Sequence, residues 1–518
     1  MLFNSYVFIF LFLPVVLAGF YGLRRGRVAW LVFASLVYYG YWKPVFLLLL
    51  GVSILGNYAA VAALMRRQGS KPILTLGVGF NLALLGYFKY AGFLVENLNA
   101  VAGAHLAVPH ILLPIGISFF TFQQIALVAD AYRGDVRNFS LLNHAFFVTF
   151  FPQLIAGPIV HHAEIMPQLD TPAGRPARDD LAVGTCIFVV GLFKKVIVAD
   201  GLAMFADAGF DTIHAGFPLG PASAWIAIFA YAFQIYFDFS GYSDMAVGLA
   251  RMFGLLLPVN FFSPYKACGF IDFWRRWHIT LSRFLKDYLY IPLGGNRRGR
   301  VRQYLNLAAV MLLGGLWHGA AWKFVLWGGG HGVMLIANHL WNRLPVARLA
   351  LWRSRLVRIP AIAVTFVAAA LLWVPFRADT LGDAIGIFRA ACPAESGVLW
   401  PSISHFLDKQ FGHILSPSVL HHWFTARELW PTPLPPDYLS TVVQPVGLVL
   451  AAVAVLTFAL PNTTQLFARF DPAAGAEKLA VRLSLRVLGF RWAVATAAMF
   501  VIAVFGLSHL SPFLYFQF

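Results

Sequence analysis

The stretch from residue 304 to residue 340 reads YLNLAAVMLLGGLWHGAAWKFVLWGGGHGVMLIANHL, and it decides the fold. It contains two apolar segments, residues 304–317 and 322–340, which are separated by a short break. Arginine clusters flank the pair at residues 297–302 and 343–358. Such clusters mark loops on the cytoplasmic side of a membrane. The pattern therefore predicts two membrane helices, one leaving the cytoplasm and one returning to it.

The composition of the whole chain agrees with a membrane protein. Hydrophobic residues make up 59% of the 518 residues, charged residues 12%, and the mean hydropathy is +0.72. Soluble domains carry about 25% charged residues, and a soluble core could not hide this much apolar surface. The 16% aromatic content excludes disorder, and three cysteines without a CxxC pair exclude a disulfide scaffold.

Apolar runs recur along the chain at residues 1–20, 30–65 (with a turn at 40–44), 73–94, 110–129, 181–199, 222–249, 359–374, 446–460 and 494–507. A spanning helix needs about 20 apolar residues, so we expect an all-α, polytopic protein with about 11 transmembrane helices. The first run lacks a basic region and a cleavage site, so we interpret it as a retained span with its N-terminus outside. Residues 144–160 are broken by Pro152 and Pro158, which favours a re-entrant or buried segment.

Three regions follow from this pattern. Residues 1–376 form the expected transmembrane core, in which residues 233–332 carry most of the polar groups. Residues 377–445 are slightly acidic and rich in Pro, Ser, His and Trp, and predict a small extracytoplasmic subdomain. Residues 446–518 contain the C-terminal membrane helices. The net charge of +17 lies in short clusters between apolar runs, which indicates membrane topology and no nucleic-acid partner.

Two carboxylates lie in the segment YFDFSGYSDMAVG at residues 236–248. Asp238 and Asp244 are six residues apart, which on a helix places them about 120° apart. They therefore do not form a paired acid–base couple. Either they are satisfied polar packing inside a helix, or they contact a substrate, because ionisable groups at membrane depth are functional candidates.

The segment DFWRRWHITLSRFLKD at residues 272–287 predicts an amphipathic helix at the cytoplasmic interface. Trp274 and Trp277 lie on its apolar face, and Arg275 and Arg276 on a basic face that could hold an anionic donor. His278 follows Trp274 by four residues and is either a buried core histidine or part of a catalytic cavity. The following YIPLGGN at residues 290–296 predicts a tight glycine turn that ends at Asn296, another candidate contact for the donor.

The break between the two decisive helices carries His318, flanked by Trp317 and Gly319. A neutral imidazole is the natural general base near pH 7, and we expect the glycine to let a substrate approach. His318 is either this base or a packed residue at a helix break. His331, beside three glycines, is a candidate helper or a packing residue. No metal-ligand spacing occurs, so we expect no metal site.

Taken together, residues 273–299 (FWRRWHITLSRFLKDYLYIPLGGNRRG) and 312–322 (LLGGLWHGAAW) resemble the membrane-bound O-acyltransferase family. The resemblance is to its branch with the alginate O-acetylation membrane protein and the teichoic-acid D-alanyl transfer protein. Residues 113–123, 151–159 and 236–248 are similar in the same order, so the likeness covers about the first 340 residues. It implies tilted helices around a central funnel, with His318 as the catalytic histidine and His278 as the second histidine.

The resemblance also implies a reaction, in which an acetyl group moves from a thioester donor to a hydroxyl group. The donor would be acetyl-coenzyme A or an acyl carrier on the cytoplasmic side, with no other cofactor. The acceptor would be an exported polysaccharide, with alginate first and cellulose or peptidoglycan as alternatives. A periplasmic acetyltransferase or acceptor protein would be a partner, and the bacterial inner membrane the location. The competing interpretation from another class is a transporter of acyl or glycan groups that makes no bonds.

Overall fold

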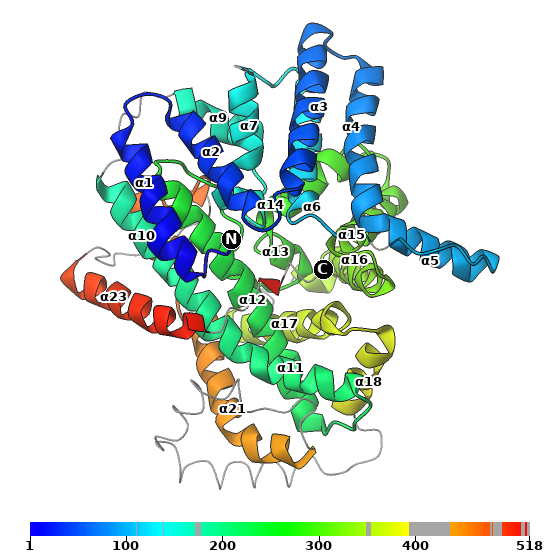
Figure 1. Ribbon diagram of the computed structural model, residues 1–518. Coiled ribbons are helices and arrows are strands. Elements are labelled where there is room, and N and C mark those ends of the chain that lie inside the picture. The colour runs from blue at the N-terminus through cyan, green and yellow to red at the C-terminus, as the bar shows by residue number, and fades with distance from the viewer. Residues whose placement is uncertain are drawn as a thin grey trace.

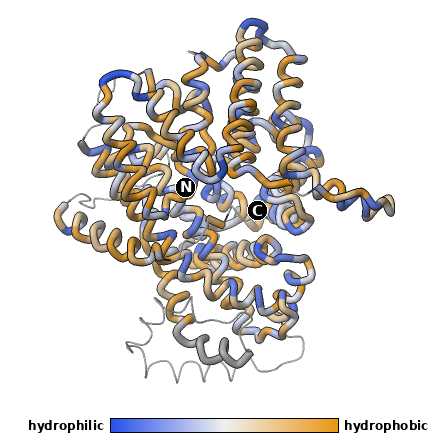
Figure 2. Tube along the Cα trace, viewed as in Figure 1, coloured by the Kyte–Doolittle hydropathy of each residue, from blue (hydrophilic) through white to orange (hydrophobic). Residues whose placement is uncertain are grey.

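The computed structural model describes residues 1–109, 111–137, 139–170, 178–348, 354–392, 436–476, 479, 489–508 and 513–514. In these ranges it contains helices and no strand, which confirms the predicted all-α class (Figure 1). Hydrophobic residues follow the helices, and hydrophilic residues gather at turns such as the one between α3 and α4 (Figure 2).

The N-terminal part consists of paired helices joined by short turns. The turn predicted at residues 40–44 separates α2 from α3, and the long helix that starts at Lys71 runs on through a π-helical turn. Its elements are η1 (Phe8–Phe12), α1 (Leu13–Gly22), α2 (Arg27–Gly40), α3 (Phe46–Arg66), α4 (Lys71–Leu85), η2 (Gly86–Tyr90) and α5 (Ala91–Ala102). A π-helical turn is often found at a functional site, and η2 contains Lys89 and Tyr90.

The next elements form the buried middle of the chain. They are α6 (Ile117–Arg133), α7 (Leu141–Thr149), α8 (Phe151–Leu154) and α9 (His162–Asp170). Residues 150–160 are buried throughout, so the proline-broken segment lies inside the protein, as the sequence predicts. Its freed backbone groups find protein partners there; for example, the amide of Ile159 donates to the hydroxyl of Thr280 at 3.0 Å.

Two long helical runs pack closely at the centre. The first comprises α10 (Arg178–Phe193), the π-helical η3 (Lys194–Ala199) and α11 (Asp200–His214), and the second is α12 (Pro221–Met252). A Cβ atom on Gly191 would lie 2.6 Å from the carbonyl oxygen of Gly241, and one on Gly248 would lie 2.6 Å from that of Gly184. Small residues allow such backbone approach between membrane helices, and this crossing brings η3 against α12.

The segment after α12 corrects the prediction of one amphipathic helix at residues 272–287. The chain instead forms η4 (Pro264–Lys266), α13 (Phe270–Trp274), α14 (Ile279–Leu285) and η5 (Lys286–Tyr290). His278 adopts a left-handed φ of 43°, which interrupts the helix between Trp274 and Ile279. Because the helix is broken there, the four-residue spacing from Trp274 does not determine where His278 points. Trp274, Trp277 and Phe284 are buried, so this segment belongs to the core.

The remaining elements complete the bundle. They are α15 (Arg300–His318), α16 (Trp322–Trp341), η6 (Pro345–Arg348), α17 (Arg355–Arg377), α18 (Leu381–Ala391), α21 (Pro436–Phe458), α22 (Thr463–Leu466), η9 (Ala468–Phe470), α23 (Phe490–Phe505) and η11 (Gly506–Ser508). Most of the predicted subdomain at residues 377–445 lies outside the described residues.

Five helical stretches of the described chain are long and apolar enough to cross a membrane: Phe46–Arg66, Lys71–Ala102, Asp179–His214, Pro221–Met252 and Leu356–Arg377. Shorter apolar helices add Phe8–Gly22, Arg27–Gly40, Val446–Phe458 and Phe490–Phe505. These stretches coincide with predicted spans, and the predicted number of about 11 stays a prediction.

Candidate active site

His318 is the last residue of α15, at the break before α16, where the sequence places it. Its side chain is 5% exposed. Three aromatic rings surround the imidazole: those of Trp317 and Trp327, with centroids 4.9 Å away, and that of Phe376, at 5.3 Å. The histidine is therefore held in a largely apolar environment.

Glycines set the close spacing of α15 and α16 around this histidine. Gly315 and Gly328 face each other, and a Cβ atom on either would overlap the backbone of the other helix. Gly319 has a different role from the predicted one, because the ring of Phe324 fills the space where its side chain would be. The missing Cβ therefore accommodates Phe324 and does not open a path for a substrate.

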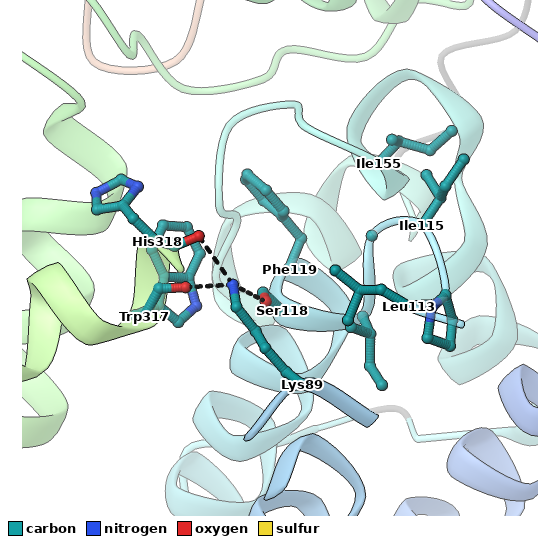
Figure 3. Close-up of a pocket in the computed structure, with 11 residues that line it drawn as sticks. Lys89, Leu113, Ile115, Ser118, Phe119, Ile155, Trp317 and His318 are labelled. Carbon is teal, nitrogen blue, oxygen red and sulfur yellow. Dashed lines mark hydrogen bonds between the residues drawn. The ribbon is translucent and has the colours of Figure 1, made fainter. Parts of the chain in front are cut away.

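The end of α15 is bound by two residues of η2. The Nζ atom of Lys89 donates to the carbonyl oxygens of Trp317 at 2.5 Å and His318 at 3.0 Å, and to the Oγ atom of Ser118 at 3.2 Å. The hydroxyl of Tyr90 donates to the carbonyl oxygen of Leu316 at 2.9 Å. Figure 3 shows the His318 ring on the far side of these carbonyls from Lys89.

A cavity of about 90 Å³ lies against the same residues. It is lined by Lys89, Leu113, Pro114, Ile115, Gly116, Ile117, Ser118, Phe119, Ile155, Trp317 and His318. This volume holds a few water molecules.

The second histidine, His278, is fully buried near Trp317. The ring centroids of His278 and Trp317 lie 6.3 Å apart, so Trp317 is a common neighbour of both histidines. The Nδ1 atom of His278 lies 3.1 Å from the Oδ1 atom of Asn260. That oxygen also accepts from the hydroxyl of Thr280 at 2.8 Å, while the Nδ2 atom of Asn260 donates to Ser243 at 3.2 Å.

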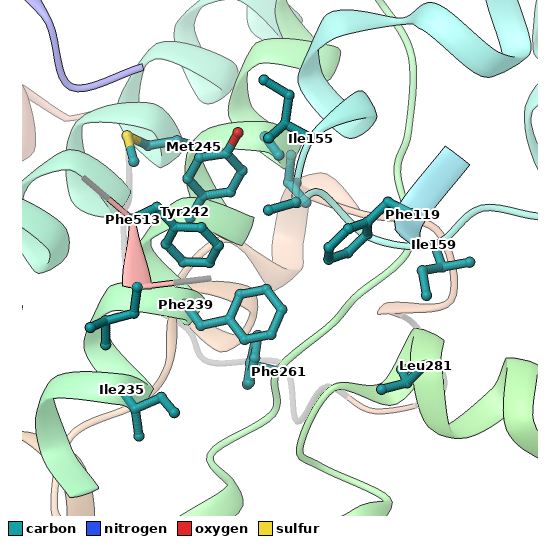
Figure 4. Close-up of a cluster of buried hydrophobic side chains, with 14 of the residues drawn as sticks. Phe119, Ile155, Ile159, Ile235, Phe239, Tyr242, Met245, Phe261, Leu281 and Phe513 are labelled. Carbon is teal, nitrogen blue, oxygen red and sulfur yellow. The ribbon is translucent and has the colours of Figure 1, made fainter. Parts of the chain in front are cut away.

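These hydrogen bonds assign the tautomer of His278. The Oδ1 atom of Asn260 is an acceptor, so a neutral His278 carries its proton on Nδ1 and presents Nε2 as an acceptor. The wall beside the ring is apolar: Phe239 lies 4.8 Å from it and packs with Phe261 and Phe513 (Figure 4).

His331 lies one helical turn beyond Trp327, whose ring centroid is 4.7 Å from that of His331. It is fully buried, with the Trp274 ring at 5.2 Å and the Phe273 ring at 5.9 Å. Trp277 continues this aromatic cluster through contacts with Phe273 and Trp373. Trp327 lies next to both His318 and His331, so this cluster is continuous with the site.

The carboxylates of α12 are engaged in ion pairs with η3. Asp238 is 2.7 Å from the Nζ atom of Lys195 and accepts from the backbone amide of Leu514 at 3.0 Å. Asp244 is 2.8 Å from the Nζ atom of Lys194 and accepts from Thr463 at 2.6 Å. This is the polar-packing arrangement that the sequence left open.

The basic candidates lie at different places. Arg275 is exposed, whereas the guanidinium of Arg276 binds Asp272 at 2.8 Å. Asn296 is exposed and follows the glycine turn, where Gly294 and Gly295 have positive φ, as predicted. From there the 19-residue helix α15 runs from Arg300 to His318, a rise of about 27 Å. Asn296 therefore lies far from the His318 imidazole.

Comparison with known proteins decides the family. The family model described as "MBOAT, membrane-bound O-acyltransferase family" matches residues 27–370, which is more than half of the chain. The chain belongs to the membrane-bound O-acyltransferase family. It is therefore a polytopic membrane acyltransferase, and the transporter interpretation is set aside.

Several named proteins are similar to this chain. The "Peptidoglycan O-acetyltransferase" of Helicobacter pylori is 43% identical, over 75% of this chain and 79% of its own length. The "Probable alginate O-acetylase AlgI" of Pseudomonas putida is 42% identical, over 75% of this chain and 80% of its own length. The "Teichoic acid D-alanyltransferase" of Bacillus subtilis is 25% identical, over 50% of this chain and 67% of its own length.

In this O-acyltransferase, four site residues were missed by the sequence analysis: Lys89, Tyr90, Ser118 and Asn260. Lys89 is a lysine inside the apolar run at residues 73–94, and an ionisable residue in such a run is a functional candidate by default. That signal could have found it. Asn260 carries no comparable signal, because a single polar residue between apolar neighbours does not reveal its partner.

Among the described residues, His214, Asp379 and Asp383 bring ligand atoms within 4.8 Å of one another. The carboxylate of Asp383 also caps α18 by accepting from the amide of Thr380 at 3.0 Å. None of the three belongs to the residues that contact His318 above, so this cluster gives no reason to involve a metal in the acyltransferase site.

Proposed function

We propose that this acyltransferase moves an acetyl group from a cytoplasmic thioester to a hydroxyl group of an exported polysaccharide. The observation that carries the proposal is the arrangement at Trp317. His318 and His278 both pack against this ring, one at a helix break beside a cavity and the other held by Asn260. Both buried imidazoles are neighbours of one ring, which supports our assignment of both to one reaction.

In the proposed reaction His318 is the general base. Its imidazole takes the proton of the acceptor hydroxyl while that oxygen attacks the thioester carbonyl carbon. A C–O bond forms, the C–S bond breaks, and the proton passes from the imidazole to the departing thiolate. Such general base catalysis contributes about 10²- to 10⁴-fold, and positioning of both substrates contributes much of the remainder.

His278 has a role that follows from its tautomer. With its proton on Nδ1 and shared with Asn260, the neutral ring accepts at Nε2 and cannot donate there. We therefore assign it to accept a hydrogen bond from a substrate group. The developing oxyanion needs donors, which backbone amides supply in many acyl-transfer enzymes.

The charge and the cavity support opposite entrances for the two substrates. The basic loops, including Arg275, Arg297 and Arg298, would attract an anionic donor such as acetyl-coenzyme A or an acyl carrier from the cytoplasm. The cavity lies between the start of α6 and the end of α15, at the ends of these helices that lie opposite Arg133 and Arg300. This supports approach of the acceptor from outside, with the chain in a bacterial inner membrane.

Alginate is our first candidate acceptor, since the AlgI relatives are named for it. Peptidoglycan is the second, because the Helicobacter pylori relative is named for it at similar identity. Cellulose stays an alternative, and a periplasmic acetyltransferase that completes the transfer is the proposed partner. No cofactor beyond the thioester is proposed.

The test is mass analysis of exported polymers from the native bacterium, from a strain lacking this protein, and from that strain producing wild type or His318→Gln. We expect acetyl esters to disappear from one polymer without the protein and to return with wild type alone. Alginate, peptidoglycan and cellulose are measured separately, so the affected polymer names the acceptor. Unchanged acetylation of all three polymers in the deletion strain would refute the proposal.

A further inference from the structure

The helix that carries His318 ends without a local cap. The last four carbonyl groups of an α-helix lack intrahelical partners and need others. The residue after α15, Gly319, is extended and supplies no capping hydrogen bond to the helix. A backbone whose end is not held locally can shift, and any shift there moves the attachment point of the imidazole.

The carbonyl groups at the end of α15 find their hydrogen-bond donors in two residues that are more than 200 positions away in the chain. Lys89 and Tyr90 bind the carbonyl oxygens of Leu316, Trp317 and His318, which are the last three of the helix. Both residues belong to the π-helical turn η2, inside the apolar stretch Lys71–Ala102. Water is scarce at that depth, so protein groups have to supply these hydrogen bonds.

The hydrogen bonds of Lys89 fit a role in holding the end of α15 better than a role in proton transfer. An ammonium group has three N–H donors, and three acceptors surround this one: two carbonyl oxygens and the hydroxyl of Ser118. Its positive charge also lies at the negative end of the α15 dipole, which is a favourable position. The His318 ring points away from Lys89, and the three hydrogen bonds of the lysine go to two backbone carbonyls and to Ser118, none of them to the ring (Figure 3).

We propose that Lys89 and Tyr90 are positioning residues, which hold the end of α15 so that the His318 imidazole stays in its reactive geometry. The inference rests on the proposed function, because it assigns these residues to the rate of that reaction. A displacement of about 1 Å at a reacting group can lower a rate about 100-fold. Loss of these hydrogen bonds should therefore reduce kcat and leave the KM for the donor unchanged.

The chain offers matched controls for both substitutions. Lys266 also donates from Nζ to a carbonyl oxygen near a helix end, that of Leu460, at 2.6 Å. The hydroxyl of Tyr21 donates to the carbonyl oxygen of Met252 at the end of α12, at 2.8 Å. Lys266→Met and Tyr21→Phe therefore remove the same kind of bond from helices that do not carry His318.

The experiment uses the full-length protein in lipid nanodiscs. Thiol release from acetyl-coenzyme A, in the presence of the polymer identified by mass analysis, gives kcat and KM. Hydrogen–deuterium exchange of residues 314–320 reports the end of α15 independently of activity. We expect Lys89→Met to lower kcat about 10- to 100-fold, Tyr90→Phe to lower it severalfold, and both to accelerate exchange there, with KM unchanged. Lys89→Arg, which keeps charge and donors, should recover part of kcat.

Each outcome decides the inference. A kcat for Lys89→Met and Tyr90→Phe equal to that of their controls would overturn it, and so would unchanged exchange at residues 314–320. Should Lys89→Met fail to fold, the test uses Tyr90→Phe, which lacks a single hydroxyl. Its kcat and its exchange at residues 314–320 are then compared with those of Tyr21→Phe. A wild-type protein that transfers no acetyl group would refute the proposed function instead, and the exchange measurement would still show whether Lys89 and Tyr90 hold the helix end.

Discussion

The Nδ1 atom of His278 lies 3.1 Å from the Oδ1 atom of Asn260, and the two residues also join two chain segments. The backbone amide of Ile279 donates to the carbonyl oxygen of Asn260 at 2.9 Å. His278 takes up its left-handed conformation at this junction, between α13 and α14. A non-glycine residue with positive φ is uncommon and persists where its surroundings hold it. Asn260 thus determines both the tautomer and the position of the second histidine.

Asn260→Ala should lower acetyl transfer about 10- to 100-fold, because His278 loses the acceptor that orients its ring. It should also lower the free energy of unfolding by about 1–3 kcal/mol, since buried donors lose their acceptor. Asn306→Ala is the control: its side chain donates to the carbonyl oxygen of Gly295 at 2.9 Å, away from both histidines. Equal activity of the two variants would contradict the role of Asn260.

His318→Gln should abolish acetylation of the exported polymer while the protein accumulates in the membrane as wild type does. Glutamine is similar in size and polar, so the packing against Trp317 and Trp327 is largely kept, but it cannot take up a proton at neutral pH. Polymer acetyl content and an immunoblot of the membrane fraction measure the two effects. Normal acetylation by this variant would remove the general base from the mechanism.

Lys195→Met should destabilise the protein by about 3–5 kcal/mol, because it leaves the buried carboxylate of Asp238 without its ion partner. Lys195 also pairs with Asp200 at 2.7 Å, so the double variant Lys195→Met with Asp238→Leu should recover only the part of that loss that is due to Asp238. Thermal unfolding in detergent measures both. If the pair is structural, the KM for the donor in the double variant equals that of wild type; a strongly raised KM would assign Asp238 to substrate binding.

Gly191→Ala should destabilise the protein by about 1–3 kcal/mol, because the added methyl group would lie 2.6 Å from the carbonyl oxygen of Gly241. Gly79→Ala makes the same change on α4, where a Cβ atom meets nothing within 4 Å. That control should be neutral or slightly stabilising, as alanine favours helix. Equal unfolding temperatures for the two variants would argue against backbone contact between α10 and α12.

Arg275→Glu should raise the KM for acetyl-coenzyme A about tenfold at low salt and less at high salt, because exposed charges are screened. Arg276→Glu is expected to act differently, through loss of the ion pair with Asp272, and to lower stability. Initial rates over a range of donor concentrations at two ionic strengths distinguish these effects. A KM for Arg275→Glu that matches wild type at both salt concentrations would show that Arg275 does not attract the donor.

Local sequence patterns were sufficient to predict the helices that are apolar and bounded by basic residues. The two helices at residues 304–340 and the turn at 40–44 form as predicted, because apolar runs and turn residues are properties of a short window; that the two helices cross the membrane stays a prediction. The prediction of one amphipathic helix at residues 272–287 was wrong because contacts with a distant segment decide the structure there. The helical periodicity of residues 272–287 is real, but hydrogen bonds from residues 260 and 262 outweigh it and break the helix at His278.

The same distinction holds for the site. The sequence by itself determined that the chain is an all-helical membrane protein and that a histidine lies at a break between two apolar helices. Tertiary structure alone decided that Lys89 holds the end of α15, that Asn260 orients His278, and that Asp238 pairs with Lys195. Polar groups in an apolar interior must find partners. The sequence shows which polar groups need a partner, but the identity of each partner depends on how helices distant in the sequence pack together.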